Sequence, residues 1–578
     1  MVLFVTCIVT ELNLEKAVAT PSSSITQQGK ERHEIKTFQD GFCGTNPNPS
    51  STEYITEYVL PQSCEMPLGI GVDIEEDRVW YVSTKRGILG SYNLEEDKFN
   101  KEKQIPSWPS RNNPREFSQV WDVEIDNRRK ERGGEGEVWF TDGKQNAIWR
   151  FFTSSNVFER YTVPGESRDF GTIYPASIEF DPNNDNIIYF VGMFSPSIWI
   201  AETDRLKNGT SEGISEIPIP IKGFEGTDPV FITTGSLAFD EKENAVWVSV
   251  MIYGYKGQIF KYNLDAKSFD IFDLPRDLSS PWGLTADDNG DLWVTNAGSS
   301  IFYKLSPKGD NNDSYNIEDF QIEKFTTSKG SSRIFGKSPE NKTERDFQNR
   351  YYTLPSMIKK SNDGSIWFNE QHGNKISKFD PLTQTLIEYW VPTQNRLWGI
   401  CSNDDYNGNS LDYSNNKNNE ICGIANVLQF SITNQVDSDN DDIDVWFSEW
   451  SQNKIGKVEA TNPPFSIDIF KSDKQLTIER GEKEKIKFIL KAAERPSSSI
   501  TEVRMVVSGT FTSSGDIGNT IGDFTEQPSS ISMEQGEEYE VSFEFVPSAH
   551  QKPGNYILMI GVENDSISYL KAISIRII

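Results

Sequence analysis

Histidine is almost absent from this chain of 578 residues, which contains only His33, His372 and His550. Three scattered imidazoles are too few for a histidine-rich metal site, and the H-E-x-x-H pattern of zinc hydrolases does not occur. The G-x-S-x-G and P-loop patterns are absent as well. The sequence therefore carries no common local signature of a metalloprotease, a serine hydrolase or a nucleotide-binding enzyme.

An excess of basic residues and a long apolar run are also missing. The chain has 57 Lys and Arg against 86 Asp and Glu, a net charge of −29. Such a surface repels phosphate backbones, which excludes nucleic acid as an expected partner. No run after residue 19 approaches the roughly 18–20 apolar residues that span a bilayer, so no transmembrane span is expected. A hydrophobic content of 36% still predicts a packed interior.

The few cysteines and the first residues together favour export. Positions 1–19 contain the apolar run "VLFVTCIVT" and end in Ala-Val-Ala, the small-x-small form of a signal-peptidase site, so 1–19 is a predicted signal peptide. The protein is then expected outside the cell or at its surface. The remaining cysteines are Cys43, Cys64, Cys401 and Cys422. They predict disulfides Cys43–Cys64 and Cys401–Cys422, and the alternative is four free thiols in a cytosolic protein.

An aromatic hairpin pattern recurs seven times along the chain. Each copy has an alternating run, a polar turn and a second alternating run, as in "GDLWVTNAGSSIFYKL". The central aromatic residues are Trp80, Trp139, Tyr189, Trp247, Trp293, Trp367 and Trp446. Because a short strand precedes each hairpin and an extended run follows most of them, each unit supplies four strands. The sequence predicts an all-β fold, a seven-bladed β-propeller over 53–471 with these aromatics packed between blades.

Other segments complete the predicted organisation. Residues 20–52 form an N-terminal loop segment, and "EYITEYVLP" after it has the pattern of a strand that could close the propeller ring. "FSIDIF" at 465–470 competes for that place. Residues 472–578 contain further alternating strands without the aromatic hairpin and without cysteine. They predict an immunoglobulin-like β-sandwich, a domain type that mostly serves as a spacer or adhesion module.

Two sets of equivalent positions are predicted to meet at one opening of the propeller, called here the mouth. The first strand of a blade begins at the end where its antiparallel partner finishes, so seven such ends converge. The first-strand starts are Leu68, Trp121, Ala176, Gly235, Trp282, Ser356 and Trp398. The second-strand ends are Ser83, Asp142, Gly192, Val250, Asn296, Glu370 and Glu449. The polar and aromatic members predict ligand-binding residues, namely Trp121, Asp142, Trp282, Asn296, Ser356 and Trp398.

Each of these positions also has a purely structural interpretation. A tryptophan at a strand start can simply fill the central tunnel, since aromatic rings bury large areas. Glu370 and Glu449 can accept backbone N–H groups at strand ends, and His372 can be an exposed turn residue. Asn146, Asn374 and Asn453 recur in the turns and suit left-handed backbone.

The blade motifs "PWGL…GDLWVTN…IFYKL" and "LWGI…DVWFSEWSQNKIGKV" resemble the streptogramin lyase (virginiamycin B lyase) family over about 55–470. The resemblance implies elimination chemistry that linearises a cyclic ester with Mg²⁺, a glutamate at the W-F-x-E position and histidine as base. Glu370 and Glu449 match the glutamate pattern. The histidine positions hold Trp282, Ser356 and Trp398 here, and His372 is the nearest substitute for the base.

A second candidate metal site lies in the acidic stretch "DSDNDDID". Asp437, Asp439 and Asp441 alternate along it and are hard oxygen ligands that suit Ca²⁺. The EF-hand pattern fails, because its sixth position is Asp442 and its twelfth is Ser448. The alternative is a solvated acidic loop. The sequence thus predicts Mg²⁺ or Ca²⁺ as the only cofactor, with metal ligands among Glu370, Glu449 and these aspartates.

Two functions remain open from the sequence. The first is an extracellular or cell-surface binding and scaffold protein whose mouth takes a small-molecule, glycan or peptide ligand, with surface proteins as further partners. The second is a Mg²⁺-dependent C–O lyase acting on a cyclic ester or carbohydrate-like substrate, with Glu370, Glu449 and His372 as catalytic residues.

Overall fold

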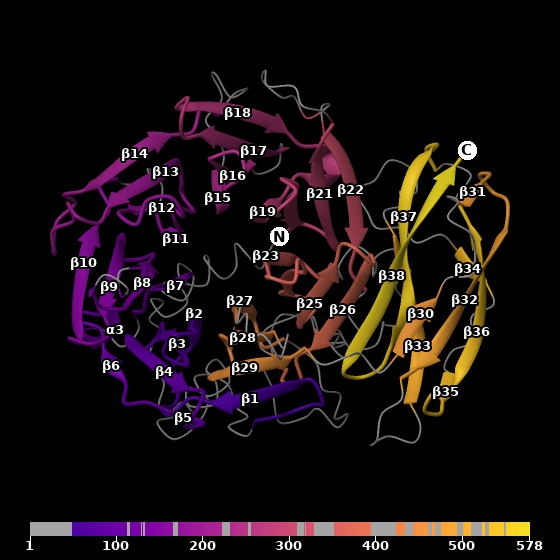
Figure 1. Cartoon of the computed structure of the whole chain (residues 1–578), viewed down its shortest axis with the longest axis horizontal. Coiled ribbons are helices and arrows are strands. Elements are labelled where there is room, and N and C mark those ends of the chain that lie inside the picture. The colour runs from indigo at the N-terminus through magenta and orange to yellow at the C-terminus, as the bar shows by residue number, and fades with distance from the viewer. Residues whose placement is uncertain are drawn as a thin grey trace, which may run out of the picture.

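A computed structural model gives the structure of the chain, shown in Figure 1. It describes residues 49–578 except 113–115, 129, 131–132, 166–170, 222–231, 253–255, 309–316, 318–319, 329–351, 395–423, 434–442, 461–464, 469–475, 494–500, 510–522, 526–530 and 548–550. A ring of sheets coloured indigo to orange lies beside a second, largely orange and yellow layer of sheets in Figure 1.

The ring is a seven-bladed β-propeller, as the repeated hairpins predict. The inner strands are β2 (Pro67–Asp73), β7 (Val123–Asp126), β11 (Pro175–Phe180), β15 (Ile232–Asp240), β19 (Pro281–Ala286), β23 (Pro355–Lys360) and β27 (Val427–Ile432). Each inner strand contacts the inner strands of the blades on either side, so the strands close a circle. The second strands are β3 (Arg78–Ser83), β8 (Glu137–Asp142), β12 (Ile187–Gly192), β16 (Ala245–Ile252), β20 (Leu292–Asn296), β24 (Ile366–Glu370) and β28 (Asp444–Glu449).

The two outer strands of each blade continue the antiparallel order. The third strands are β4 (Ile88–Asn93), β9 (Ala147–Phe152), β13 (Ser195–Glu202), β17 (Lys256–Asn263), β21 (Ile301–Pro307), β25 (Lys375–Asp380) and β29 (Lys454–Glu459). The outermost strands are β5 (Lys98–Phe99) with β6 (Lys103–Gln104), β10 (Val157–Thr162), β14 (Ile214–Pro218), β18 (Ser268–Asp273), β22 (Phe320–Thr326), β26 (Thr385–Trp390) and β1 (Ile55–Val59). Only short helices interrupt them, α3 (Pro109–Asn112) and η2 (Arg276–Leu278) among the described residues.

The N-terminal strand closes the ring. β1 pairs antiparallel with β29, with Ile55 opposite Val458 and Val59 opposite Lys454. Figure 1 shows β1, in indigo, lying along the orange β29. The competing segment forms β30 (Phe465–Asp468) and pairs with β32 (Glu484–Ala492) instead. Closure by the first strand ties the two ends of the propeller together and supplies the fourth strand of blade 7.

The predicted inner strand of blade 7 was wrong. The Leu-Trp-Gly-Ile segment containing Trp398 was placed there, but β27 pairs with β28, with Val427 opposite Glu449. Leu428 therefore holds the position assigned to Trp398, which lies outside the described residues. The reason is that "LWGI" copies the inner-strand motif of blade 5, whereas "VLQFSI" has the required alternation without its glycine.

The repeated aromatics pack between blades, as expected from their recurrence. Trp80 of blade 1 lies 5.8 Å from the Phe151 ring of blade 2, and Trp293 of blade 5 lies 5.5 Å from Phe379 of blade 6. Trp446 of blade 7 contacts Tyr92 of blade 1 at 5.6 Å. Such ring pairs add to the large apolar area that each aromatic side chain buries.

The second layer is a β-sandwich of two sheets. One sheet has the order β30-β32-β36-β34, with β36 (Glu538–Val546) and β34 (Asp523–Thr525). The other contains β31 (Leu476–Ile478), β38 (Ile567–Ile577), β37 (Gly554–Glu563), β33 (Thr501–Gly509) and β35 (Ile531–Met533). β30 lies ahead of residue 472, the expected start of this unit. The domain limits and the immunoglobulin-like character stay predictions.

The sandwich joins the propeller through a shared sheet. β38 pairs antiparallel with the outer strand β26 of blade 6, so blade 6 and one sandwich sheet form nine continuous strands. Trp390 donates its indole N–H to Ser568 Oγ at 2.8 Å, and the hydroxyls of Thr326 and Ser508 lie 2.9 Å apart. Backbone pairing of this kind resists hinge motion because bending would break a ladder of hydrogen bonds.

The described residues bear on two further predictions, the absence of a transmembrane span and the disulfides. No helix among them is long and apolar enough to cross a membrane. Cys64 is disulfide-bonded. Its predicted partner Cys43 and the pair Cys401 and Cys422 lie outside the described residues, so both pairings stay predictions.

Candidate functional site

The predicted mouth is present as an arrangement of strand ends. The first residue of β23, Pro355, lies opposite Glu370, and Pro281 and Val427 lie opposite Asn296 and Glu449. Equivalent ends therefore converge as the hairpin geometry predicts. The side chains at these strand ends, however, are buried, whereas a ligand-binding mouth was expected to expose them.

Apolar side chains fill the centre of the mouth. Trp121 and Trp282 are 0% and 1% exposed and belong to one buried apolar cluster. The same cluster contains Met66, Leu68, Tyr174, Met193, Phe194, Met251, Met357 and Leu428. The interpretation that the tryptophans fill the tunnel fits this burial, because a ring covered on all sides offers no face for stacking. A ligand-binding role of Trp121 and Trp282 stays a prediction.

The polar residues predicted to bind ligand hold the blades together internally. Asp142 accepts hydrogen bonds from the Trp149 indole at 2.9 Å and from the Gln145 side chain at 2.8 Å, and burial raises its pKa. Asn296 accepts from the backbone N–H of Ser280 at 3.0 Å. Ser356 bonds to Asn369 at 3.0 Å. All three predicted residues are buried. Their hydrogen-bonding capacity is used within the fold.

Glu370 lies in a fully buried cluster centred on a lysine. Lys375 Nζ stands 3.6 Å from Glu370 Oε2 and 2.9 Å from Glu388 Oε2, and all three side chains are 0% exposed. Ser377 donates its hydroxyl to Glu370 Oε1 at 2.5 Å, and the Ser328 N–H bonds Glu388 at 2.7 Å. Burial, opposed by Lys375 and reinforced by Glu388, raises the pKa of Glu370 to about 8. One cation for two carboxyls leaves Glu370 largely protonated at neutral pH.

Glu449 lies in an equivalent cluster one blade further on. Lys454 Nζ is 2.7 Å from Glu57 Oε2 and 2.7 Å from Thr393 Oγ1. Neither carboxyl oxygen of Glu449 has a hydrogen-bond partner, although the residue is fully buried. Burial, followed by the charge of Glu57, raises its pKa well above the ordinary range. Its neutral form avoids placing two negative charges beside one buried lysine.

His372 is buried, so the alternative interpretation as an exposed turn residue is wrong, and its catalytic role stays a prediction. Its side chain is 7% exposed, its backbone N–H bonds the Thr353 carbonyl at 2.9 Å, and Nε2 has no partner. Burial lowers its pKa to about 3, so the ring is neutral at physiological pH. The turn after β24 is held against the residues that precede β23, because the N–H groups of Gln371 and Gly373 bond the carbonyls of Leu354 and Thr353. His372 is also the one histidine among the described residues.

The carboxyls predicted as metal ligands lie apart and beside lysines. Glu370 and Glu449 belong to different blades, each lies in a cluster with a lysine ammonium group, and the pKa of each is raised. Mg²⁺ binding by Glu370 and Glu449 stays a prediction. Among the described residues, no group of three or more His, Cys, Asp or Glu side chains could hold a metal ion. Asp437, Asp439 and Asp441 lie outside the described residues, so Ca²⁺ binding there stays a prediction.

The lysine partners and a second charged group were not predicted from the sequence. Lys375 and Lys454 follow Glu370 and Glu449 by five residues in "NKISK" and "NKIGK", a repeated signal that was visible. The second group lies on the inner strands, where Lys359 Nζ of blade 6 bonds Glu124 of blade 2 at 2.7 Å. These blades are not neighbours, so the pair spans the central channel. Asp122 and Glu179 flank it, and burial raises their pKa values to about 7 and about 8.

Comparisons with known proteins give structural similarities only. No family model and no curated protein matches the chain. A selenomethionine-substituted virginiamycin B lyase from Staphylococcus aureus is 20% identical, covering 70% of this chain and 99% of its own, with a TM-score of 0.45. A catalytically inactive form of that enzyme with quinupristin has the same identity and a TM-score of 0.44. An extracellular domain of a one-component system from B. thetaiotaomicron is 14% identical over 89% of this chain and 57% of its own, with a TM-score of 0.38.

Proposed function

We propose that this protein is an exported binding and scaffold protein in which the propeller and the sandwich act as one rigid support. The observation that carries the proposal is the complete burial of Glu370 and Glu449 beside Lys375 and Lys454. Carboxyls that are neutral and 0% exposed serve the packing of blades 6 and 7. The partners in view are small-molecule, glycan or peptide ligands and other surface proteins.

The shared sheet supports the scaffold part of this proposal. Because β26 and β38 pair over Thr385–Tyr389, the sandwich is held in one orientation relative to blade 6. A fixed orientation keeps binding surfaces on the two units at a constant separation, which lowers the entropic cost of engaging two partners at once. The disulfide at Cys64 supports export, since such bonds persist mainly in oxidising compartments.

A turnover assay tests the proposal against its rival. The purified full chain is incubated with quinupristin, the compound named with the inactive lyase, with and without Mg²⁺, and the linear product is sought by chromatography. The expected result is no conversion above the protein-free control. Mg²⁺-dependent conversion that disappears in the His372→Ala variant would overturn the binding and scaffold proposal.

One observation favours the rival, a lyase. The neutral His372 ring has an unpartnered Nε2 in the turn that directly follows Glu370. Glu370 lies against this turn, because a Cβ added at Gly373 would stand 2.6 Å from Glu370 Oε2. A neutral imidazole next to a carboxyl is a common acid–base arrangement. In that case Glu370 would have to lose its proton before it could help to hold Mg²⁺.

A further inference from the structure

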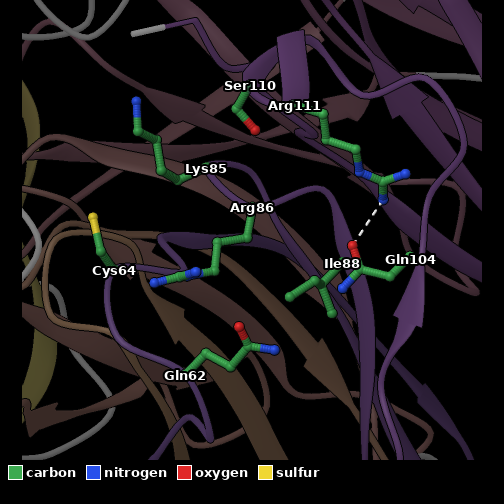
Figure 2. A pocket seen from close by; sticks show the side chains of 8 residues that line it. All are labelled: Gln62, Cys64, Lys85, Arg86, Ile88, Gln104, Ser110 and Arg111. Carbon is green, nitrogen blue, oxygen red and sulfur yellow. Dashed lines mark hydrogen bonds between the residues drawn. The ribbon is translucent and has the colours of Figure 1, made fainter. Parts of the chain in front are cut away.

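A basic pocket stands out on this acidic protein. It lies on blade 1, has a volume of ≈ 320 Å³, and is lined by Lys85, Arg86 and Arg111 together with polar side chains such as Gln62 and Gln104. None of the described side chains that line it is acidic. Figure 2 shows the three cationic side chains distributed around the pocket, with Arg111 directed toward Gln104. Three cations gathered on a chain of net charge −29 create a local field opposite to that of the molecule.

Hydrogen bonds hold the two guanidinium groups in place. Arg86 donates from Nε to the Ser63 carbonyl at 2.6 Å and from Nη2 to the Ser63 hydroxyl at 3.2 Å. Arg111 donates from Nη2 to the Gly87 carbonyl at 3.2 Å and to Gln104 at 2.9 Å. The Nη1 groups of both arginines have no protein acceptor among the described residues. Donors that are fixed before binding lose little side-chain entropy when a ligand arrives.

The third cation is held in an environment that disfavours its charge. Lys85 Nζ lies 5.1 Å from the Phe117 ring centre, and burial, followed by the charge of Lys144, lowers the Lys85 pKa. Lys144 itself lies 3.7 Å from Glu116. An anion in the pocket would relieve this repulsion between neighbouring ammonium groups.

Two carboxyls bond the pocket residue Gln62 and contribute to the charge balance of the pocket. Gln62 donates its backbone N–H to Glu65 at 2.8 Å and its side-chain amide to Glu102. Burial raises the pKa of Glu65 to about 8, so this carboxyl is largely neutral at physiological pH. The three cationic side chains that line the pocket thus outnumber these two carboxyls, and the lining keeps a positive balance.

We propose that this pocket binds a small molecule carrying a tetrahedral oxyanion, a phosphate or sulfate ester. Guanidinium forks match the oxygens of such groups, and a tetrahedral anion has enough oxygens to engage three separate cationic side chains. The volume lies at the lower end of ligand pockets and leaves room for a short organic remainder. The pocket uses the turn after β3, strand β6 and helix α3. The turn follows Ser83 at the mouth end of blade 1, and none of the lining side chains belongs to the buried apolar cluster that fills the centre of the mouth.

Calorimetric titration of the full chain tests the proposal. The probes are inorganic phosphate, inorganic sulfate, glucose 6-phosphate and glucose 6-sulfate, at fixed ionic strength. Saturable binding of at least one ester is expected, and Arg111→Gln should weaken it at least about tenfold because a charge-assisted contact is lost. Arg205→Gln is the matched control, since Arg205 is exposed and pairs with Glu202 away from the pocket. It should leave the affinity unchanged.

The outcomes separate the proposal from its rivals. Tighter binding of an ester than of its inorganic ion supports a pocket for an organic anion. Absence of saturable binding, or equal loss in Arg111→Gln and Arg205→Gln, would overturn the proposal, because the second result indicates general charge screening. If Arg111→Gln shifts the unfolding midpoint, Lys85→Gln replaces it, and unchanged binding in a folded Lys85→Gln protein would also contradict the proposal.

Discussion

Blades 6 and 7 contain the same buried cluster built in two ways. In each blade a lysine at the start of the third strand, Lys375 or Lys454, contacts a glutamate of the outer strand, Glu388 or Glu57. Ser328 and Thr393 hold equivalent places as hydroxyl partners of these groups. Each cluster sets one lysine between two glutamates, and blade 6 has Glu563 of the sandwich as a further carboxyl near Lys375. The two clusters can be compared in how the second carboxyl, Glu370 or Glu449, is accommodated.

The difference lies two residues after the lysine. Blade 6 has Ser377, which donates to Glu370, whereas blade 7 has Gly456, which has no side chain to donate. A Cβ at Gly456 would stand 2.1 Å from the Phe447 ring, so blade 7 has no room for a serine. The side chain of Glu449 consequently accepts no hydrogen bond from a hydroxyl, while Glu370 accepts one from Ser377, and Glu449 faces the Glu57 carboxyl instead. The Phe447 ring thus excludes a hydroxyl donor from the blade 7 cluster.

Removing the shared lysine should have the largest effect. Lys454→Met leaves Glu57 and Glu449 buried without a cation, which is expected to destabilise the protein by about 3–5 kcal/mol. Lys457→Met is the control, because Lys457 pairs with Asp444 nearer the surface and its loss should cost at most about 1 kcal/mol. Denaturant unfolding measures both. Equal losses of unfolding free energy in the two variants would show that the buried cluster stabilises the protein no more than a surface ion pair does.

The pH dependence of stability should expose the protonated carboxyl of blade 6. The pKa of Glu370 is about 8 in the folded protein, whereas the ordinary value, taken for the unfolded chain, is 4.5. Between these values the folded state binds a proton that the unfolded chain releases. Its contribution is therefore complete below pH 4.5 and is lost as the pH rises toward 8. Unfolding free energies measured across this range should decline less in Glu370→Gln than in the natural protein. Parallel curves would refute a raised pKa at Glu370.

Converting the blade 6 cluster into its blade 7 form should have the smallest effect. Ser377→Gly removes the hydroxyl partner of Glu370 and is expected to cost about 1–2 kcal/mol in unfolding free energy. Ser377→Ala is the matched variant, because it removes the same hydroxyl without adding glycine flexibility, and it should show most of the loss. A Ser377→Ala protein as stable as the natural one would mean that Glu370 does not depend on this bond.

The sequence predicted much of the fold because the propeller repeats a local pattern. Trp293 and its equivalents mark the second strand of each blade. The alternation of apolar and polar residues around them predicts hairpins without long-range information. The prediction for blade 7 was wrong at Trp398, because a segment similar to the inner-strand motif precedes the actual inner strand, Val427–Ile432, by many residues. Pairing of β38 with β26 was not predictable, since edge pairing between two units has no local signature.

The site was predicted in position but not in character. Glu370 stands at the strand end where it was expected, yet its burial depends on Lys375 and on Glu388, which lies in another strand. Whether a carboxyl at a strand end faces solvent or a lysine is decided by packing between strands. The exposed turn offered as the alternative for His372 rested on the general rule that loop tips are polar and accessible, and packing within the blade overrides that rule here.

The protonation state of Glu449 tests the central claim most directly, because the account makes it a buried neutral group rather than a metal ligand. Infrared difference spectra between the natural protein and Glu449→Gln can be recorded at neutral pH, with and without Mg²⁺. The account predicts a protonated carboxyl band that disappears in the variant and does not respond to Mg²⁺. A carboxylate band at neutral pH that shifts when Mg²⁺ is added would contradict it.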